Sequence, residues 1–308
     1  MKKISPARVF EAGGIKGGQH SRDTEKDTLI EELRKKAAEL LTSGDVKVVI
    51  GYGEGPSDGR VTPIFITDPA NVDKLIFDAR CKNNLAFYLK KPDVTNLGKV
   101  AIVAKGADAR AINVLLLENQ LNRENLVILG VTLDDAEPPK LHPSEAFRFN
   151  TPPIYDFLFG KEVAQKGWEE TTFSLLDELE KMTPEQRWEF WQGHLSRCIK
   201  CYACRQACPI CTCTRCIADK NQPQWVPTSP HAMGDLHWNI TRAFHLAGRC
   251  ISCGECARAC PMDIPLNLLN LKISKEVFEQ FGFQTGMDAE APPPMATYKQ
   301  EDDQSFIG

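Results

Sequence analysis

The chain has 308 residues, of which 42% are hydrophobic and 25% are charged, and its formal net charge is −4. This length accommodates two domains of ordinary size with buried cores. The lack of a basic excess or a polybasic run argues against nucleic acid and anionic lipid as partners. No apolar stretch reaches the roughly 18 residues of a membrane-spanning helix, and no apolar segment follows the charged first residues as in a secretory signal. We therefore expect a cytoplasmic protein without a membrane span.

The first half of the chain predicts an α/β domain. Residues 1–22 are rich in glycine and charge and are expected to form an irregular arm. Beyond them, apolar runs bounded by turn residues predict strands, and segments with helical periodicity predict helices. The expected strands are 46–52, 63–67, 74–77, 99–104 and 125–131, and the expected helices are 24–43, 84–89 and 107–121. Because strands alternate with helices, residues 23–150 are predicted to form a mixed or largely parallel sheet with helices.

The second half predicts a mainly α-helical domain over residues 151–282. Prolines between residues 138 and 153 mark the connector. Thr183-Pro184-Glu185-Gln186 has the composition of a capping box, with Thr183 as the N-cap of a helix. Residues 283–308 are Pro-rich and acidic, so we expect an extended C-terminal tail, either wrapped around a partner or disordered. Further helices are expected at 168–182, 236–249 and 266–281.

Two loops in the first half are compatible with phosphate or anion binding. Residues 51–55 (GYGEG) follow a strand, but a turn and a second strand come next, so a glycine-rich hairpin is favoured. Residues 105–108 (KGAD) lie between a strand and a helix N-terminus, where a plain βα turn is the favoured interpretation. No nucleophile set and no histidine spacing suggests catalysis or metal binding, so no catalytic residue is assigned.

The twelve cysteines are concentrated in one region. Only Cys81 lies in the first 197 residues, and the other eleven fall between Cys198 and Cys260. In a cytoplasmic chain, closely spaced cysteines indicate metal ligands rather than disulfides. The cysteines therefore locate the chemistry of the protein in its second half.

Two copies of the C-x₂-C-x₂-C-x₃-C-P motif of bacterial ferredoxins account for eight of these cysteines. In this motif three thiolates bind one cubane, and the fourth cysteine ligates the other cluster. We expect the fourth cysteine to begin a helix that the following proline suits. A zinc ribbon would show pairs of cysteines instead. The motif predicts two [4Fe–4S] clusters, the first held by Cys198, Cys201, Cys204 and Cys260, and the second by Cys250, Cys253, Cys256 and Cys208.

Charged residues immediately precede both triplets. Arg197 and Arg249 could offset the negative charge of the clusters, and a solvated arginine is an equally good interpretation.

Four cysteines remain outside the two motifs. One interpretation is a third [4Fe–4S] cluster, a second is a zinc site with four thiolates, and a third is that some are free thiols. The Cys-x-Cys pair favours a metal site, because two adjacent loop thiols rarely both pack into a core. The four residues are Cys81, Cys211, Cys213 and Cys216.

Both halves resemble components of anaerobic redox complexes. The first half, with KVAIVAKGADARAINVLLLENQLNRENLVILGV, resembles the beta subunits of deazaflavin-coenzyme-reducing hydrogenases and dehydrogenases. The second half, with RAFHLAGRCISCGECARACPMDIPLNLLNLKI, resembles the dicluster ferredoxin subunits of hydrogenase, formate dehydrogenase and heterodisulfide reductase complexes. The resemblance implies other redox subunits of such a complex as partners.

The sequence departs from the flavin-bearing beta subunits at two places. Those proteins carry a Pro-Cys pair after the strand at 99–104 and another cysteine after the next strand. Here the corresponding residues are Lys105-Gly106 and Thr132-Leu133-Asp134. The cluster ligands of that family are therefore missing from the first half, and bound flavin is not carried over.

Together these features predict an electron-transfer subunit rather than a catalytic one. It would relay single electrons through two or three [4Fe–4S] clusters in an oxidoreductase complex of an anaerobe. One alternative is a flavin-dependent reductase whose α/β domain carries the chemistry and is fed by the clusters. Another is an assembly protein whose clusters are structural.

Overall fold

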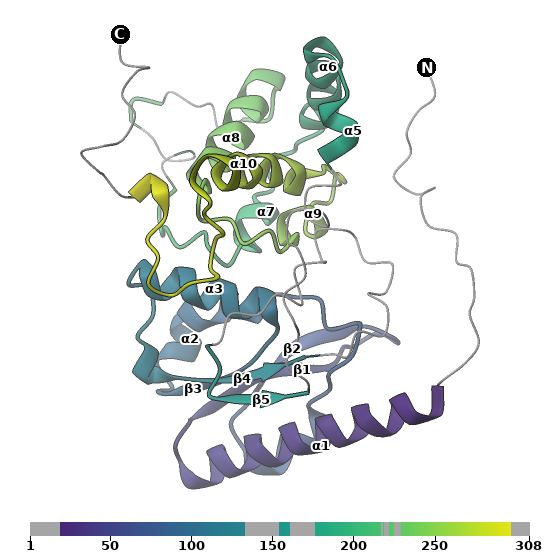
Figure 1. The fold of residues 1–308 in the computed structure, drawn as a ribbon, viewed down its shortest axis with the longest axis vertical. Helices are drawn as coiled ribbons and strands as arrows, with labels where there is room; N and C mark the ends of the chain where they lie inside the picture. Colours follow the sequence, from purple (N-terminus) through teal and green to yellow (C-terminus); the bar gives the residue numbers. More distant parts are fainter. Residues whose placement is uncertain are drawn as a thin grey trace.

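A computed structural model describes residues 19–132, 154–160, 176–216, 218, 222–224 and 229–296 (Figure 1). The N-terminal part is a sheet with helices, and the C-terminal part is a group of helices stacked on one side of it. The predicted fold class, an α/β unit followed by a mainly helical one, is confirmed. Most of the expected arm, the proline-rich connector, much of the helix at 168–182 and the end of the tail lie outside the described residues.

The sheet has five strands in the order β2-β1-β3-β4-β5. β1 and β2 form an antiparallel hairpin, and the remaining neighbours are parallel, with Val48 opposite Val100 and Val100 opposite Leu126. All of β3 and β4, and β1 up to its last residue, are buried, as expected for a sheet covered on both faces. The strands are β1 (Val48–Glu54), β2 (Val61–Ile66), β3 (Val100–Ala104), β4 (Leu126–Val131) and β5 (Phe157–Phe159).

Helices cover both faces of the sheet. α1 (Gln19–Ser43) lies below it in Figure 1 and buries Leu33, Ala37 and Leu40. α3 (Gly106–Leu117) lies on the opposite face, between the sheet and the C-terminal helices. Every residue from Gly106 to Leu115 is buried, because α3 has protein on both sides. This helix is therefore the layer on which the C-terminal part rests.

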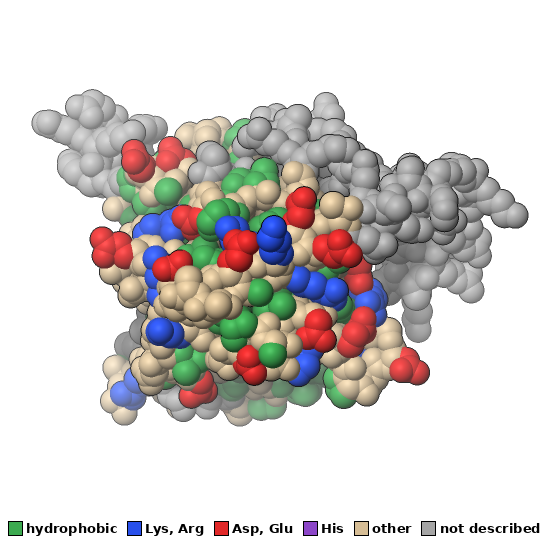
Figure 2. All heavy atoms as spheres, turned by 90° about the horizontal axis from the view of Figure 1, so that it is seen from below, with side chains coloured by type: hydrophobic (Ala, Val, Ile, Leu, Met, Phe, Trp, Pro, Cys, Tyr) green, Lys and Arg blue, Asp and Glu red, His purple; other side chains and the backbone are tan. Residues whose placement is uncertain are grey.

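Figure 2 shows the face of the molecule on the α1 side. Acidic and basic side chains are interspersed there, with small apolar areas between them. None of the helices in the described part of the chain combines the length and the hydropathy needed to cross a membrane.

Three elements of the N-terminal part differ from the prediction. No strand forms at 74–77. Instead Pro69 and the Asp68 side chain start the 3₁₀ helix η2 (Pro69–Lys74), and Ile76 makes only an isolated bridge to Tyr52. α1 begins at Gln19, earlier than expected, and the short strand β5 was not predicted. The shorter elements of this half are η3 (Leu85–Lys90), α2 (Pro92–Thr95) and η4 (Arg123–Asn125).

The two loops considered as phosphate or anion sites adopt the structures that the sequence favoured, a hairpin at 51–55 and a βα turn at 105–108. Residues 51–55 lead into the β1–β2 hairpin, where the Gly55 N–H donates to the carbonyl of Arg60. The turn before α3 contains a buried ion pair between Lys105 and Asp108, with Nζ and Oδ2 2.9 Å apart. Asp108 also accepts hydrogen bonds from the N–H groups of Lys105 and Leu85. The protein thus supplies its own anion at this helix N-terminus.

The C-terminal part is built from six helices and a final 3₁₀ turn in the described residues. The predicted capping box is confirmed, because Thr183 and Gln186 exchange hydrogen bonds at the start of α6. α8 contacts both α6 and α10. The elements are α5 (Asp177–Glu180), α6 (Pro184–Leu195), α7 (Ala203–Gln206), α8 (Ala232–His245), α9 (Glu255–Arg258), α10 (Leu266–Phe281) and η7 (Pro294–Ala296).

The first residues of the predicted tail are anchored on α3. The Asn113 side chain donates to the carbonyl of Gly286 at 2.9 Å, and Thr285 is buried. Gly286 has a φ of +76°, and a Cβ there would lie 2.5 Å from the carbonyl oxygen of Arg110. Only glycine permits both this conformation and this close approach.

We expect Gly286→Ala to lower the free energy of unfolding by about 3 kcal/mol, through left-handed strain and a clash with backbone. Gly282→Ala is the matched control, because Gly282 has a φ of +61° with nothing within 4 Å of an added Cβ. It should cost only about 1 kcal/mol. Equal costs, measured by anaerobic thermal unfolding, would show that the tail does not pack tightly on α3.

Candidate metal centres

The two cysteine triplets adopt the same loop conformation. Lys200 and Tyr202 in the first loop have left-handed φ values of 50° and 60°, and Ser252 and Gly254 at the equivalent positions have 57° and 74°. Non-glycine residues rarely adopt such values away from functional sites. Left-handed residues in tight turns let successive backbone N–H groups converge, which creates a concavity for an anion. Both loops therefore have the backbone form of an anion-binding site.

Each loop leads into a one-turn helix that carries the third cysteine. α7 carries Cys204 and α9 carries Cys256, and both thiols are buried. The Ser252 N–H lies 3.4 Å from the Cys250 sulfur, so backbone donors already face a thiol in this loop.

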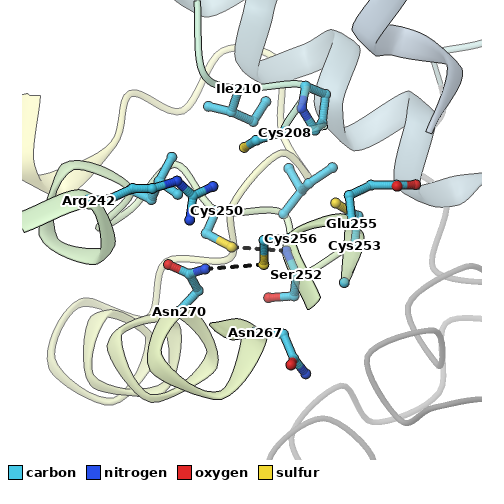
Figure 3. Close-up of a pocket in the computed structure, with 14 residues that line it drawn as sticks. Cys208, Ile210, Arg242, Cys250, Ser252, Cys253, Glu255, Cys256, Asn267 and Asn270 are labelled. Carbon is cyan, nitrogen blue, oxygen red and sulfur yellow. Dashed lines mark hydrogen bonds between the residues drawn. The ribbon is translucent and has the colours of Figure 1, made fainter. Parts of the chain in front are cut away.

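A pocket joins the second triplet to the last cysteine of the first motif. Figure 3 shows the sulfur atoms of Cys208, Cys250, Cys253 and Cys256 around this pocket. Ile210, Ile251 and Leu246 provide apolar walls. Four thiols around an apolar pocket with backbone donors match the chemistry of a [4Fe–4S] cubane.

The first triplet lies in a second apolar cluster. Cys198, Cys204 and Cys260 pack there together with Trp238. Burial raises the pKa of the Cys204 thiol to about 12, and the nearby thiols of Cys256, Cys198 and Cys260 add to this rise. Cys201, the remaining member of the predicted set, is exposed. The structure thus brings Cys260, together with Cys256, of the second motif to Cys198 and Cys204 of the first.

Two asparagines donate to sulfur. Asn270 on α10 donates to the Cys256 sulfur at 3.7 Å. Burial raises the pKa of the Cys198 thiol, and a hydrogen bond from Asn239 on α8 partly opposes this rise. Hydrogen bonds to cluster sulfur are one of the protein's means of setting a reduction potential.

Two buried arginines near the thiols were not predicted. Arg242 on α8 lines the pocket, and its Nη2 donates to the carbonyl of Cys204 at 3.0 Å. Burial lowers its pKa, but the thiolates of Cys208 and Cys256 outweigh this effect and raise it. Arg110 on α3 is 1% exposed, and burial lowers its pKa to about 10 although the Cys253 and Cys250 thiolates oppose this. The sequence signal that could have identified both residues is an arginine within an otherwise apolar helical segment.

The arginines noted in the sequence have partners other than the thiols, although Arg249 also donates to the carbonyl of Ile210 at 3.3 Å. Arg249 forms a two-pronged ion pair with Glu118, with Nη2 and Oε2 2.6 Å apart, so its charge is balanced by a carboxylate. Arg197 contacts the ring of His194 and the carbonyl of Asp263.

The expected helix start at each fourth cysteine is wrong. Cys208-Pro209 and Cys260-Pro261 each begin a short turn, with Cys211 N–H and Asp263 N–H donating back to the cysteine carbonyls. α10 begins only at Leu266, and no helix follows Cys208 within the described residues up to 216. The turn itself is enough to direct each cysteine toward the opposite triplet.

The four remaining cysteines are placed in different surroundings. Cys81 is buried in the core of the α/β part, and its sulfur accepts from the Asp78 N–H at 3.4 Å. Cys211 hydrogen-bonds Cys208, which lowers the pKa of Cys208 and raises that of Cys211. Cys213 is exposed, and Cys216 packs against the apolar cluster of the first triplet. Among the described residues, no three His, Cys, Asp or Glu side chains converge as a single metal ion would require.

Contacts from the α/β part hold the second loop in place. The buried Glu255 carboxylate accepts from the Asn84 N–H at 2.7 Å and pairs with Arg258 at 2.6 Å. Arg258 in turn donates to the carbonyl of Lys82. Lys90 donates to the carbonyls of Pro209 and Cys211. The pocket itself is lined by residues of the C-terminal part, and these contacts from the α/β part hold its loops from behind.

The comparisons with known proteins agree with this geometry. Residues 197–265 match the family of 4Fe-4S dicluster domains. The predictions of a ferredoxin-like module and of two [4Fe–4S] clusters are thereby confirmed.

Relatives that match part of the chain include two formate dehydrogenase beta subunits. The F420-dependent formate dehydrogenase subunit beta of Methanocaldococcus jannaschii is 36% identical over 108 residues, which are 34% of this chain. The F420-dependent formate dehydrogenase 1 subunit beta of Methanococcus maripaludis is 36% identical over 109 residues, 35% of this chain. Each match covers 27% of the relative's length. The resemblance to beta subunits of such complexes, stated from the sequence, is confirmed over these segments.

We expect Glu255→Ala to lower the free energy of unfolding by about 2 kcal/mol, since it leaves the Asn84 N–H and Arg258 without their buried partner. Lys181→Ala, which removes an ion pair whose side chains are 70% and 81% exposed, should change it by less than about 0.5 kcal/mol. Anaerobic thermal unfolding measures both. A Glu255→Ala protein as stable as this control would contradict the assigned role.

Proposed function

We propose that this chain is an electron-transfer subunit of a cytoplasmic oxidoreductase complex in an anaerobe. The observation that carries the proposal is the pair of thiol sets, each assembled from both cysteine motifs, within a region that matches 4Fe-4S dicluster domains. When bound, each cluster accepts and passes on one electron at a time. The protein holds the two sites next to each other, so it can connect a donor subunit to an acceptor subunit.

The ligand sets are part of the proposal. The first cluster is held by Cys198, Cys201, Cys204 and Cys260, and the second by Cys250, Cys253, Cys256 and Cys208. The pocket in Figure 3 supports the second set, and the packing of Cys260 against the first triplet supports the first.

The partners proposed are other redox subunits of a hydrogenase, formate dehydrogenase or heterodisulfide reductase type of complex. Formate dehydrogenase is supported by the names of both relatives. The alternative of a flavin-dependent reductase predicts that flavin is released from the purified protein by acid, and its absence would leave the relay role. No described contact specifically favours flavin, since Lys105 at the end of β3 is engaged by Asp108.

Anaerobically purified protein should contain about eight iron atoms and eight acid-labile sulfides per chain, as expected for two cubanes. Both clusters should be reducible by dithionite and visible by electron paramagnetic resonance. About twelve iron atoms would add a third cluster at the four remaining cysteines, and eight iron atoms with one zinc would make that site structural. Far fewer than eight in intact protein never exposed to air, or clusters that resist reduction, would refute the relay.

The crossed ligand sets predict which variants damage which cluster. Cys208→Ala should impair the same spectroscopic signal as Cys253→Ala, although the two residues belong to different motifs. Cys260→Ala should instead impair the signal lost in Cys204→Ala. Cys81→Ala serves as the control and leaves about eight iron atoms if Cys81 is a core thiol. If Cys208→Ala and Cys204→Ala affect one and the same cluster, the sets are not crossed.

A further inference from the structure

Arg242 lies between the two thiol sets. Its Nη2 donates to the carbonyl of Cys204, in the loop of the first set, and lies 4.0 Å from the sulfur of Cys211 beside Cys208. The rest of the side chain lines the pocket of the second set and points into it (Figure 3). Only 7% of the residue is exposed, so solvent does little to screen its charge.

No anionic side chain other than the thiols offsets this charge in the described part of the chain. Arg242 forms no ion pair with a described carboxylate, and its Nε is buried without a hydrogen-bond partner there. Arginine remains protonated in proteins. Arg249, by contrast, is balanced by Glu118. Arg242 is thus a net positive charge aimed at the second pocket.

A cluster bound to four thiolates is an anion, and reduction adds one more negative charge. A fixed cation in a buried site stabilises the reduced form more than the oxidised form, because the attraction grows with the charge of the cluster. Net charge around a cluster is one of the factors that set its potential. The charge also lies near Cys204 of the first set, but only the second pocket is lined by the Arg242 side chain, so the first set is expected to feel less of this effect.

We propose that Arg242 sets the reduction potential of the second cluster, making it easier to reduce than its thiol ligands alone would. This inference rests on the proposed electron relay and assigns a role to a residue that does not bind the clusters. Arg242 acts on the cluster through its charge and not through a bond to iron.

The test is a redox titration of the complete chain, monitored by electron paramagnetic resonance. Arg242→Met should lower the midpoint potential of the second cluster by at least the 59 mV that corresponds to a tenfold change for one electron. The first cluster should shift less. Arg242→Lys should restore part of the shift, because it keeps the charge. Cys201→Ser, which alters an exposed ligand of the first set only, identifies the signal of each cluster.

A matched control removes a balanced pair instead of a net charge. The double variant Lys272→Met with Glu276→Gln deletes a cation and its carboxylate together on α10, which also carries Asn270, and should change the reduction equilibrium constant of each cluster by less than about twofold. The proposal is overturned if Arg242→Met retains about eight iron atoms and an unchanged second potential. It is also overturned if Arg242→Lys behaves like Arg242→Met.

If Arg242→Met loses its clusters, its potentials cannot be measured and a second uncharged variant replaces it. Arg242→Gln is then compared with Arg242→Lys, and equal potentials, or loss of iron in all three variants, would make Arg242 a structural support only. Failure of the relay itself is distinguishable, because wild-type protein would then show no reversible couples, whatever the Arg242 variants do.

Discussion

The contact between α3 and the cysteine loops is the interaction on which the rest of the structure depends. α3 is buried on one side by the sheet and on the other by the C-terminal part. Around it, Glu118 pairs with Arg249, Asn84 donates to Glu255, and Lys90 holds the turn after Cys208. The α/β domain therefore packs behind the loops that line the second pocket.

Several thiols buried at one place can ionise only if positive charge lies near them. Burial raises the pKa of Cys250 to about 12, which means that its thiolate is unfavourable without compensating positive charge. Bound iron would supply most of that charge. Of the two buried arginines, Arg110 lies near Cys250 and Cys253, and Arg242 lies near Cys208 and Cys256. A buried arginine is itself costly unless anions surround it. Arg110 and the thiolates of Cys250 and Cys253 thus stabilise each other only when both parts of the chain are in place.

Much of this arrangement could be predicted from the sequence, and the limits have physical causes. Continuous apolar runs predicted β3 and β4, and the Thr183 capping box fixed the start of α6, because these signals are local. The apolar run at 74–77 was predicted to be a strand because it is hydrophobic. In the structure Leu75 and Phe77 are buried although they lie in a loop, and Arg34 donates to the carbonyl of Leu75. Arg242 was missed because its surroundings come from segments about 30 residues away in sequence. The ligand sets and the role of Cys81 stay predictions.

The composition of the second pocket constrains how the protein matures. Cys208 precedes the other three thiols by more than 40 residues, and α8 with Arg242 lies between them. A nascent chain that ends before Cys250 has no second pocket at all. With the proposed ligand set, the iron donor would act only after the chain up to Cys256 has left the ribosome. Assembly of this centre would then follow the packing of the C-terminal part against the α/β core, which is made first.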